Sequence, residues 1–219
     1  MKEGIRMAGA AAVLVLLAGS TWAGVGVTLK AGTLGLGADV TFPLVASNLN
    51  FRAGYNGAAL NLDVDLDEAA CDGKITWSTI PILLDWHPGG GDFRLSGGVV
   101  INNNKVVLSA TPTQAFELND VEYSIEGVDG DITFEQVAWY IGIGGGNALA
   151  EGRVHVAIDF GVMFQGKPTA AATATASIPA LQDAINADLQ TEVDEFQKDY
   201  LDSFVIYPVI SMGISFTFF

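Results

Sequence analysis

Residues 204–219, at the end of the chain, read FVIYPVISMGISFTFF. From Ile206 onward a large apolar residue or proline occupies every second position, and small or weakly polar residues lie between them from Ser211 to Thr217. A period of two is typical of a β-strand whose two faces differ. In a soluble sandwich the apolar face would point into the core, whereas in a membrane barrel it points to lipid and the thin polar face lines the interior.

The composition favours a membrane barrel. Half of the residues are hydrophobic and the mean hydropathy is +0.37, yet after residue 23 no apolar run approaches the roughly 20 residues of a membrane helix. The 26 glycines are scattered through alternating segments, which suits closely packed strands. A soluble secreted β-sandwich is the main alternative, but its aromatic-rich outward positions would expose too large an apolar surface.

The N-terminus has the pattern of a secretory signal peptide. Lys2 and Arg6 precede an apolar segment at residues 10–18, and Thr21-Trp22-Ala23 fits a cleavage site. We therefore predict a cleaved signal peptide at 1–23, export through the inner membrane, and a single domain at 24–219.

Charge and cysteine content exclude several classes of partner and fold. The formal net charge is −15 and basic clusters are absent from the sequence, so nothing in it favours binding to nucleic acid or to anionic lipid headgroups. Cys71 is the single cysteine, which excludes an internal disulfide framework.

Eight segments alternate in this way along the chain. They are residues 25–31, 34–42, 50–67, 74–87, 93–110, 132–146, 153–165 and 206–218. The apolar parity changes across Gly32-Thr33, which a two-residue hairpin turn or a bulge in one long strand would explain equally well. With a turn the count is eight strands and with a bulge it is seven. We predict an all-β fold, a single eight-stranded antiparallel transmembrane β-barrel.

Loop lengths predict how the barrel sits in the membrane. Short turns at 43–48, 88–92 and 147–152 alternate with longer connections. The longer connections are at 67–73, 111–131 and 165–203. Outer-membrane barrels have short periplasmic turns and long extracellular loops, so we place the short turns and the C-terminus in the periplasm.

The last long connection contains an amphipathic helix at about residues 179–201. Pro179 is suited to a first helical position. An apolar stripe at helical spacing follows: Leu181, Ile185, Leu189, Val193 and Phe196. We expect the helix to pack over the barrel mouth. Before it, residues 169–177 alternate Thr with Ala, and we expect them to extend the preceding strand beyond the membrane.

Several charged residues fall on the inward parity of the strands. The predicted polar network of the lumen is Asp39, Arg52, Asp85, Arg94, His155 and Asp159; Lys30 is also inward. Charges inside a barrel must be paired, because an isolated buried charge costs several kcal/mol. We interpret the set as a plug of salt bridges, with a gate or ion path as the alternative.

The sequence predicts neither catalytic residues nor a cofactor. His87 and His155 lie in or beside the short periplasmic turns, away from the extracellular end at which outer-membrane enzymes act, and they form no Ser, His and acid grouping. Asp63, Asp65 and Asp67 alternate at the outer rim, but the glycine and the closing Glu of a calcium loop are missing. We interpret them as solvated carboxylates, so that no metal site is predicted.

Five segments together resemble a family of small proteobacterial outer-membrane proteins. They are GTLGLGAD from Gly32, DWHP from Asp85, FRLSGG from Phe93, IDFGVMFQGKP from Ile158 and YPVISMGISF from Tyr207. These proteins look like barrels of the OmpA or OmpW kind. The resemblance implies a bacterial outer-membrane location and no catalytic residue. It departs at the end of the chain, where Phe218 is in phase with the outward face and Phe219 is an extra residue.

The resemblance also implies the surroundings of the protein. Outer-membrane lipid and lipopolysaccharide are the expected contacts, and the barrel assembly machinery is expected to recognise the C-terminal strand. The expected function is structural or loop-mediated binding in the cell envelope. A narrow channel for small apolar molecules is the alternative, favoured by Leu83, Val100 and Met163 on the inward parity, and an outer-membrane lipid-modifying enzyme is a third hypothesis. The oligomeric state is left open.

Overall fold

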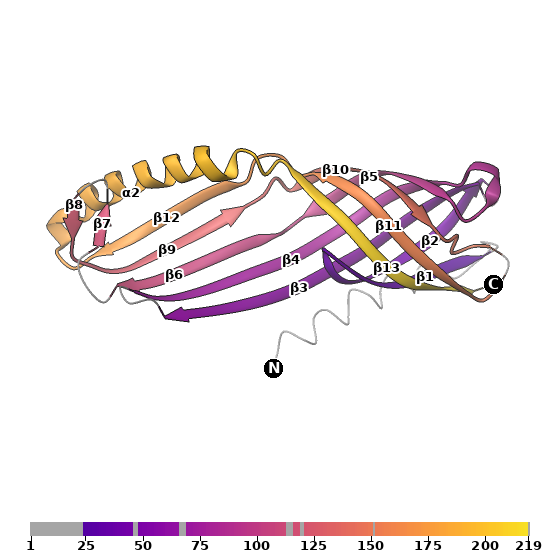
Figure 1. The fold of residues 1–219 in the computed structure, drawn as a ribbon, viewed down its shortest axis with the longest axis horizontal. Helices are drawn as coiled ribbons and strands as arrows, with labels where there is room; N and C mark the ends of the chain where they lie inside the picture. The colour runs from indigo at the N-terminus through magenta and orange to yellow at the C-terminus, as the bar shows by residue number, and fades with distance from the viewer. Residues whose placement is uncertain are drawn as a thin grey trace.

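The computed structural model describes residues 24–45, 48–65, 69–112, 116–118, 121–150 and 152–218. The predicted signal peptide at 1–23 lies outside these residues. Figure 1 shows an elongated molecule in which long strands form one curved sheet and one main helix runs beside it. None of the helices among the described residues is long and apolar enough to cross a membrane.

Eight antiparallel strands close into a ring, in which each strand is hydrogen-bonded to both of its neighbours. In order around the ring they are Val25–Gly32 (β1), Gly35–Val45 (β2), Leu49–Asp65 (β3), Ala69–Trp86 (β4), Arg94–Asn102 (β5), Val137–Gly145 (β10), Val154–Phe164 (β11) and Ile206–Phe218 (β13). Pairing of β13 with β1 closes the ring between the two ends of the sequence. Closure leaves the strands without a free edge within the ring, whereas β3 beyond Gly57 pairs with β4 alone.

The turn between β1 and β2 decides the strand count. Gly32 pairs with Gly35, so Thr33 and Leu34 form a two-residue hairpin loop rather than a bulge. Gly35 has a φ of +93°, a conformation that favours glycine. The ring therefore has eight strands, and the seven-stranded alternative is wrong.

The described residues form a sheet of eleven strands, three more than predicted. The halves of β3 and β4 far from the short turns continue beyond the ring, and β4 changes partner along its length. Residues 79–86 of β4 pair with β5, and residues 69–76 pair with Lys105–Pro112 (β6). Two more strands follow, Ile125–Thr133 (β9) and Thr169–Ala176 (β12). We call the far half of the β3–β4 hairpin with β6, β9 and β12 the extension (Figure 1).

The prediction of one strand over residues 93–110 was wrong. The chain breaks between β5 and β6, where Asn104 accepts a hydrogen bond from the backbone of Ser78 at 2.9 Å through its side-chain oxygen. Asn102 in turn accepts one from the backbone of Asn104 at 3.2 Å. Asparagine side chains compete in this way with regular ladder bonds, so β6 can leave the ring and join β4 further along.

The connection predicted as loop at 111–131 contains strands. Phe116–Leu118 (β7) and Val121–Tyr123 (β8) form a two-stranded sheet, and β9 follows. The Thr and Ala segment is also a separate strand, because β11 ends at Phe164 and β12 pairs with β9 rather than lengthening β11.

The polarity of the sheet reverses where the extension begins. On β4 the outward side chains from Ile80 to Trp86 are apolar and exposed, whereas the same face carries polar residues from Asp72 to Ser78. The inward face of β4 is mixed in the ring, with buried Leu83 and Asp85, and carries Ile75 on the extension. The register of β3 with β4 stays continuous. The apolar parity shift along β3 is thus an exchange of faces without a bulge.

The predicted helix covers part of the apolar face of the extension. Short helices at Pro179–Leu181 (η2) and Gln197–Leu201 (η3) flank Gln182–Phe196 (α2), so the helical segment spans the predicted residues. Ile185 and Leu189 of α2 are buried against Ile125, Ala174 and Ala176. The helix therefore lies on β12 and β9, not over the mouth of the ring, because the chain provides an additional sheet for its apolar stripe.

Two glutamines at the ends of α2 bind the free edge of β12. Each glutamine side chain both accepts and donates a backbone hydrogen bond. Gln182 accepts from Ala176 N (3.0 Å) and donates to Ala174 O (2.7 Å). Gln197 accepts from Ala170 N (3.0 Å) and donates to Pro168 O (2.7 Å). The helix rises about 22 Å between the glutamines, close to the about 20 Å from Ala170 to Ala176 along the strand. Their side chains thus stand in for a neighbouring strand at both ends of the edge.

Candidate functional site

The site is a cluster of charged side chains in the interior of the ring. Six strands contribute one charged residue each: Lys30 (β1), Asp39 (β2), Arg52 (β3), Asp85 (β4), Arg94 (β5) and Asp159 (β11). Period-two alternation points them all inward from their strands. Three carboxylates face three cations, so the cluster as a whole is neutral.

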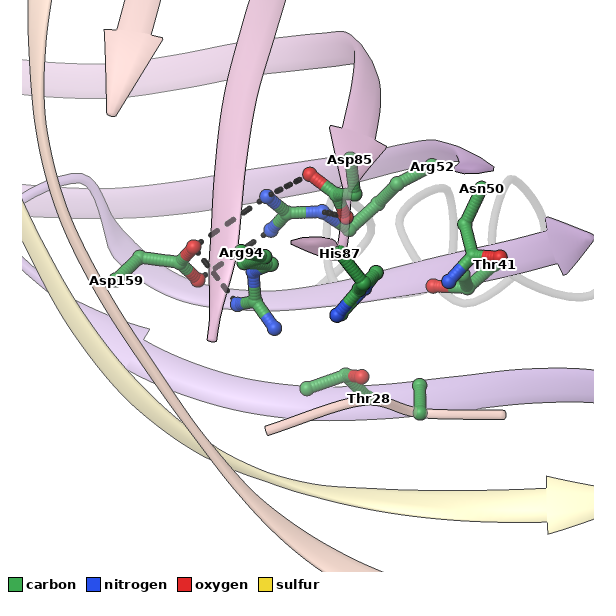
Figure 2. A pocket seen from close by; sticks show the side chains of 9 residues that line it. Thr28, Thr41, Asn50, Arg52, Asp85, His87, Arg94 and Asp159 are labelled. Carbon is green, nitrogen blue, oxygen red and sulfur yellow. Dashed lines mark hydrogen bonds and ion pairs between the residues drawn. The ribbon is translucent and has the colours of Figure 1, made fainter. Parts of the chain in front are cut away.

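Arg52 contacts all three carboxylates of the cluster, and Figure 2 shows its guanidinium between Asp85 and Asp159. It binds Asp85 in bidentate fashion, with Nε to Oδ2 at 2.7 Å and Nη2 to Oδ1 at 3.0 Å. Its Nη1 also contacts Oδ2 of Asp39 at 3.2 Å and Oδ2 of Asp159 at 3.3 Å. The planar guanidinium can satisfy several carboxylates at once, which a lysine in this position could not do.

Arg94 and Lys30 complete the pairing. Arg94 Nη2 donates to Oδ1 of Asp159 at 2.7 Å, and its Nη1 bonds the carbonyl oxygen of Gly146. Lys30 Nζ lies 2.7 Å from Oδ2 of Asp39. Ser96 supports the cluster by donating to Oδ1 of Asp85 at 2.6 Å.

Glycines in the wall make room for these groups. A Cβ on Gly54 would collide with the carboxylate of Asp39, and one on Gly144 would lie 2.9 Å from Nε of Arg94. Both glycines occupy inward positions, where a side chain would displace the charged groups. Inward glycines opposite charged residues are thus a signal in the sequence that the interior is filled.

The structure brings together five of the six residues of the predicted network and leaves His155 apart. His155 lies four residues before Asp159 on β11, which is about 13 Å along a strand. Its Nε2 lies 3.3 Å from the carbonyl oxygen of Gly152. Parity placed it on the inward face, but its position near the end of the strand separates it from the charges.

The interior between the cluster and the short turns is polar. Asn50 and Asn147 are fully buried there, with Nδ2 of Asn50 3.4 Å from Oδ1 of Asn147. His87, in the turn after β4, has its Nδ1 3.0 Å from the carbonyl oxygen of Gly91. Burial lowers the pKa of His87, which favours the neutral imidazole. A cavity between these polar residues and the charge cluster is lined by Asn50, His87 and Arg52, among others. Its volume is about 10 Å³, room for about one water molecule.

The interior on the other side of the cluster is apolar. A buried cluster fills it: Leu34, Leu83, Val100, Ala138, Tyr140, Met163 and Val209. Between this cluster and Arg52 lies a cavity of only about 20 Å³. Leu83, Val100 and Met163 match the inward parity in the sequence. Leu34 does not, because it enters from the β1–β2 turn, where alternation gives no direction.

The acidic rim residues do not assemble a metal site in the described part of the chain. Asp63 is exposed on the polar face of the extension, opposite Asp72 of β4. The side chain of Asp65 and the whole of Asp67 lie outside the described residues. Across these residues no group of three His, Cys, Asp or Glu side chains is arranged to hold a metal ion.

Comparison with known proteins supports the fold and does not identify a family. No protein-family model and no curated protein matches the chain. The structure is similar to the crystal structure of Acinetobacter baumannii CarO2, with a TM-score of 0.57 and 17% identity over 91% of this chain and 100% of that one. It is also similar to that of Acinetobacter baumannii CarO, with a TM-score of 0.54 and 20% identity over 88% of this chain and 97% of that one.

A more distant similarity, to a major outer membrane protein from Thermus thermophilus, has a TM-score of 0.46 and 13% identity over 89% of this chain and 99% of that one.

Proposed function

We propose that this chain is an integral β-barrel of the bacterial outer membrane with a closed interior and a non-enzymatic role in the cell envelope, structural or in binding through its extension. One observation carries the proposal. The outward face of the ring is apolar around a charge cluster in its interior, and this outward polarity reverses on the extension. Such a reversal suits a ring that meets lipid and a sheet that meets water on its outer face.

The apolar band has the height that a bilayer requires. β13 presents apolar side chains outward along its whole length of 13 residues, and most of them are strongly exposed. Thirteen residues extend over about 40 Å, or about 28 Å along the membrane normal at a strand tilt of 45°. The hydrocarbon core is about 30 Å thick. The same strand ends on Phe218, which is exposed on the apolar face.

The distribution of the connections supports an orientation. The short connections 46–48, 87–93 and 146–153 share one end of the ring, and the extension leaves from the other. Placing the short turns in the periplasm puts the extension outside the cell, next to lipopolysaccharide. The barrel assembly machinery would then recognise β13, which closes the ring.

The contacts of the two histidines support the non-enzymatic reading. His87 and His155 make hydrogen bonds to backbone carbonyl oxygens of nearby glycines. A catalytic triad would instead require a hydroxyl or thiol nucleophile and an acid within hydrogen-bond reach of an imidazole.

The apolar cluster between Arg52 and the extension favours a second candidate, a narrow channel for small apolar molecules. Such a solute could enter among Leu83, Val100 and Met163 only if this packed region opened. The charges around Arg52 would block it further along, because an apolar solute would have to displace buried ion pairs.

The experiment that tests the proposal is localisation of the full-length chain in a Gram-negative host. We expect the protein in the outer-membrane fraction, and we expect the unheated protein to migrate differently from the heated protein on a denaturing gel, as a folded barrel does. A protein that stays soluble in the periplasm without detergent and shows no heat-dependent mobility would overturn the proposal in favour of the soluble sandwich.

A further inference from the structure

We propose that the extension carries a binding site for a small uncharged apolar molecule, in the groove between α2 and the apolar face of the sheet. The inference deepens the binding role proposed above and rests on it, because it places the ligand site of the barrel outside the ring. Within the described part of the ring, the cavities beside Arg52 have volumes of only about 10 and 20 Å³.

The groove is formed by the side of the sheet that α2 leaves uncovered. Its volume is about 300 Å³, at the lower end of the range for small-molecule sites. Strands β4, β6, β9 and β12 and the last turns of α2 contribute to it. Its main apolar side chains are Leu108, Val128, Ile132, Ala172, Val193 and Phe196.

Small residues in the floor make the groove deep. Gly130 and Ala172 lie beneath it, and a Cβ on Gly130 would meet only ordinary contacts, the nearest at 3.5 Å. Phe196 forms the wall and stacks on Tyr200 with ring centroids 5.4 Å apart. Leu108 and Phe196 remain 49% and 43% exposed, so water meets apolar side chains on both sides of the groove. Filling it with an apolar molecule would remove that contact.

The charges around the groove select against an anionic ligand. The helical segment 182–201 carries six acidic residues and one lysine, and the chain has a net charge of −15. Asp131, whose strand passes along the groove, pairs with Lys105 at 3.3 Å. A carboxylate or phosphate headgroup would therefore meet repulsion from α2. The same acidic helix opposes closure of the groove by a second copy of the chain.

The volume sets the ligand size. At roughly 30 Å³ per non-hydrogen atom, close to the volume of a water molecule in the liquid, the groove takes about ten such atoms. Decanol has this size and no charge. Decanoate has the same chain length with a carboxylate, so the pair of molecules tests both the size and the charge requirement.

Cys71 provides the readout, because it is the single cysteine and lines the groove. We would reconstitute the full-length protein in lipid nanodiscs, confirm the barrel by its heat-dependent gel mobility, and measure the rate at which a water-soluble maleimide alkylates Cys71. Decanol at about nine times its dissociation constant should slow the reaction about tenfold, because only a tenth of the sites stay empty. Decanoate should protect much less.

A matched pair of variants on β9 tests the location. Gly130→Leu puts a side chain into the groove, whereas Gly127→Leu puts it on the opposite face of the same strand, where a Cβ would lie 3.6 Å from its nearest neighbour. We expect protection by decanol to disappear in Gly130→Leu and to persist in Gly127→Leu.

Three results would overturn the inference while leaving the barrel intact. One is an alkylation rate that decanol does not change, and another is equal protection in both variants. The third is a rate that is slow without any ligand and rises on dilution before reconstitution, which would mean that a second copy covers the groove. Failure to obtain a heat-modifiable barrel would instead count against the proposed function.

Discussion

Arg52 of β3 binds Asp159 of β11, the strand that lies directly opposite in the eight-stranded ring, with Nη2 3.3 Å from Oδ1 and Nη1 3.3 Å from Oδ2. The two residues are 107 positions apart in the sequence. Because the guanidinium also holds Asp85 and Asp39, one side chain links four of the eight strands across the interior. The charge cluster is therefore both the filling of the ring and a connection through its centre.

Replacing Arg52 with Met should destabilise the ring strongly. The change leaves three buried carboxylates with only Arg94 and Lys30 as cations, and removing one partner of a buried ion pair costs about 3–5 kcal/mol. The measurement is the urea concentration at which the heat-dependent gel shift is lost. Arg153→Met, at an exposed arginine beside the β10–β11 turn, is the control and should leave that concentration nearly unchanged. Equal midpoints for the two variants would show that the cluster does not hold the ring.

Period-two alternation predicted the ring because it acts on every strand independently. It identified Asp39, Arg52, Asp85, Arg94 and Asp159 as inward residues. A ring of eight strands has a narrow interior, which brings these side chains together. It could not separate His155 from them, since parity gives the face of a residue and not its height along the strand.

The strands of the extension could not be predicted from the sequence for a different reason. Strands β3 and β4 exchange their apolar face beyond the ring, and β6, β9 and β12 pair with residues distant in sequence. Alternation of Thr and Ala in β12 shows a strand but not its partner. The break at Asn103-Asn104 depends on hydrogen bonds to the distant Ser78, from its backbone N–H to the side chain of Asn104 and from the backbone N–H of Asn103 to its carbonyl oxygen, which no local pattern encodes.

Ile185→Ala should detach α2 from the extension without opening the ring. Ile185 is fully buried against the sheet, and truncating such a side chain costs about 2–5 kcal/mol. We expect faster proteolysis within 182–196 and an unchanged heat-dependent gel shift. The control is Leu181→Ala, at a position that is 40% exposed. Loss of the gel shift in Ile185→Ala would mean that the helix supports the ring itself.

Gln197→Ala should expose one end of the β12 edge. The amide of Ala170 then loses its acceptor and the carbonyl of Pro168 its donor, a loss of about 1 kcal/mol for each bond. Hydrogen exchange at the Ala170 amide should become several-fold faster. Gln190→Ala removes a glutamine whose bond, to Asp194, stays within the helix, so exchange at Ala170 should not respond. An unchanged rate in Gln197→Ala would rule out the role of Gln197 at the edge.

The stability of the connection between the helix and β13 should depend on pH through the ionisation of Asp202. A hydrogen bond from Lys167, 2.8 Å away, and one from Gln197 lower the pKa of Asp202 below its ordinary value of 3.8. The contact therefore stabilises the folded segment above pH 3.8, and this contribution disappears as the pH falls through the lowered pKa. Lys167→Met should raise the pKa of Asp202. The measurement is a pH titration of the carboxyl carbon of Asp202 by NMR.

Lys198→Met is the matched control for that measurement, because Lys198 is exposed on the same segment. The pKa of Asp202 should change less in this variant than in Lys167→Met. An equal rise in both would point to the overall field of the segment rather than to the Lys167 contact.

Conductance of the reconstituted protein in a planar bilayer shows whether the interior of the ring is closed. Insertion is first established by flotation with liposomes and by the heat-dependent gel shift. With ion pairs across the ring and cavities of about 10 and 20 Å³ beside them, the inserted protein should give no discrete current steps. Reproducible steps from the wild-type protein, absent when the same amount of heat-denatured protein is added, would show that the barrel conducts and that its interior is open.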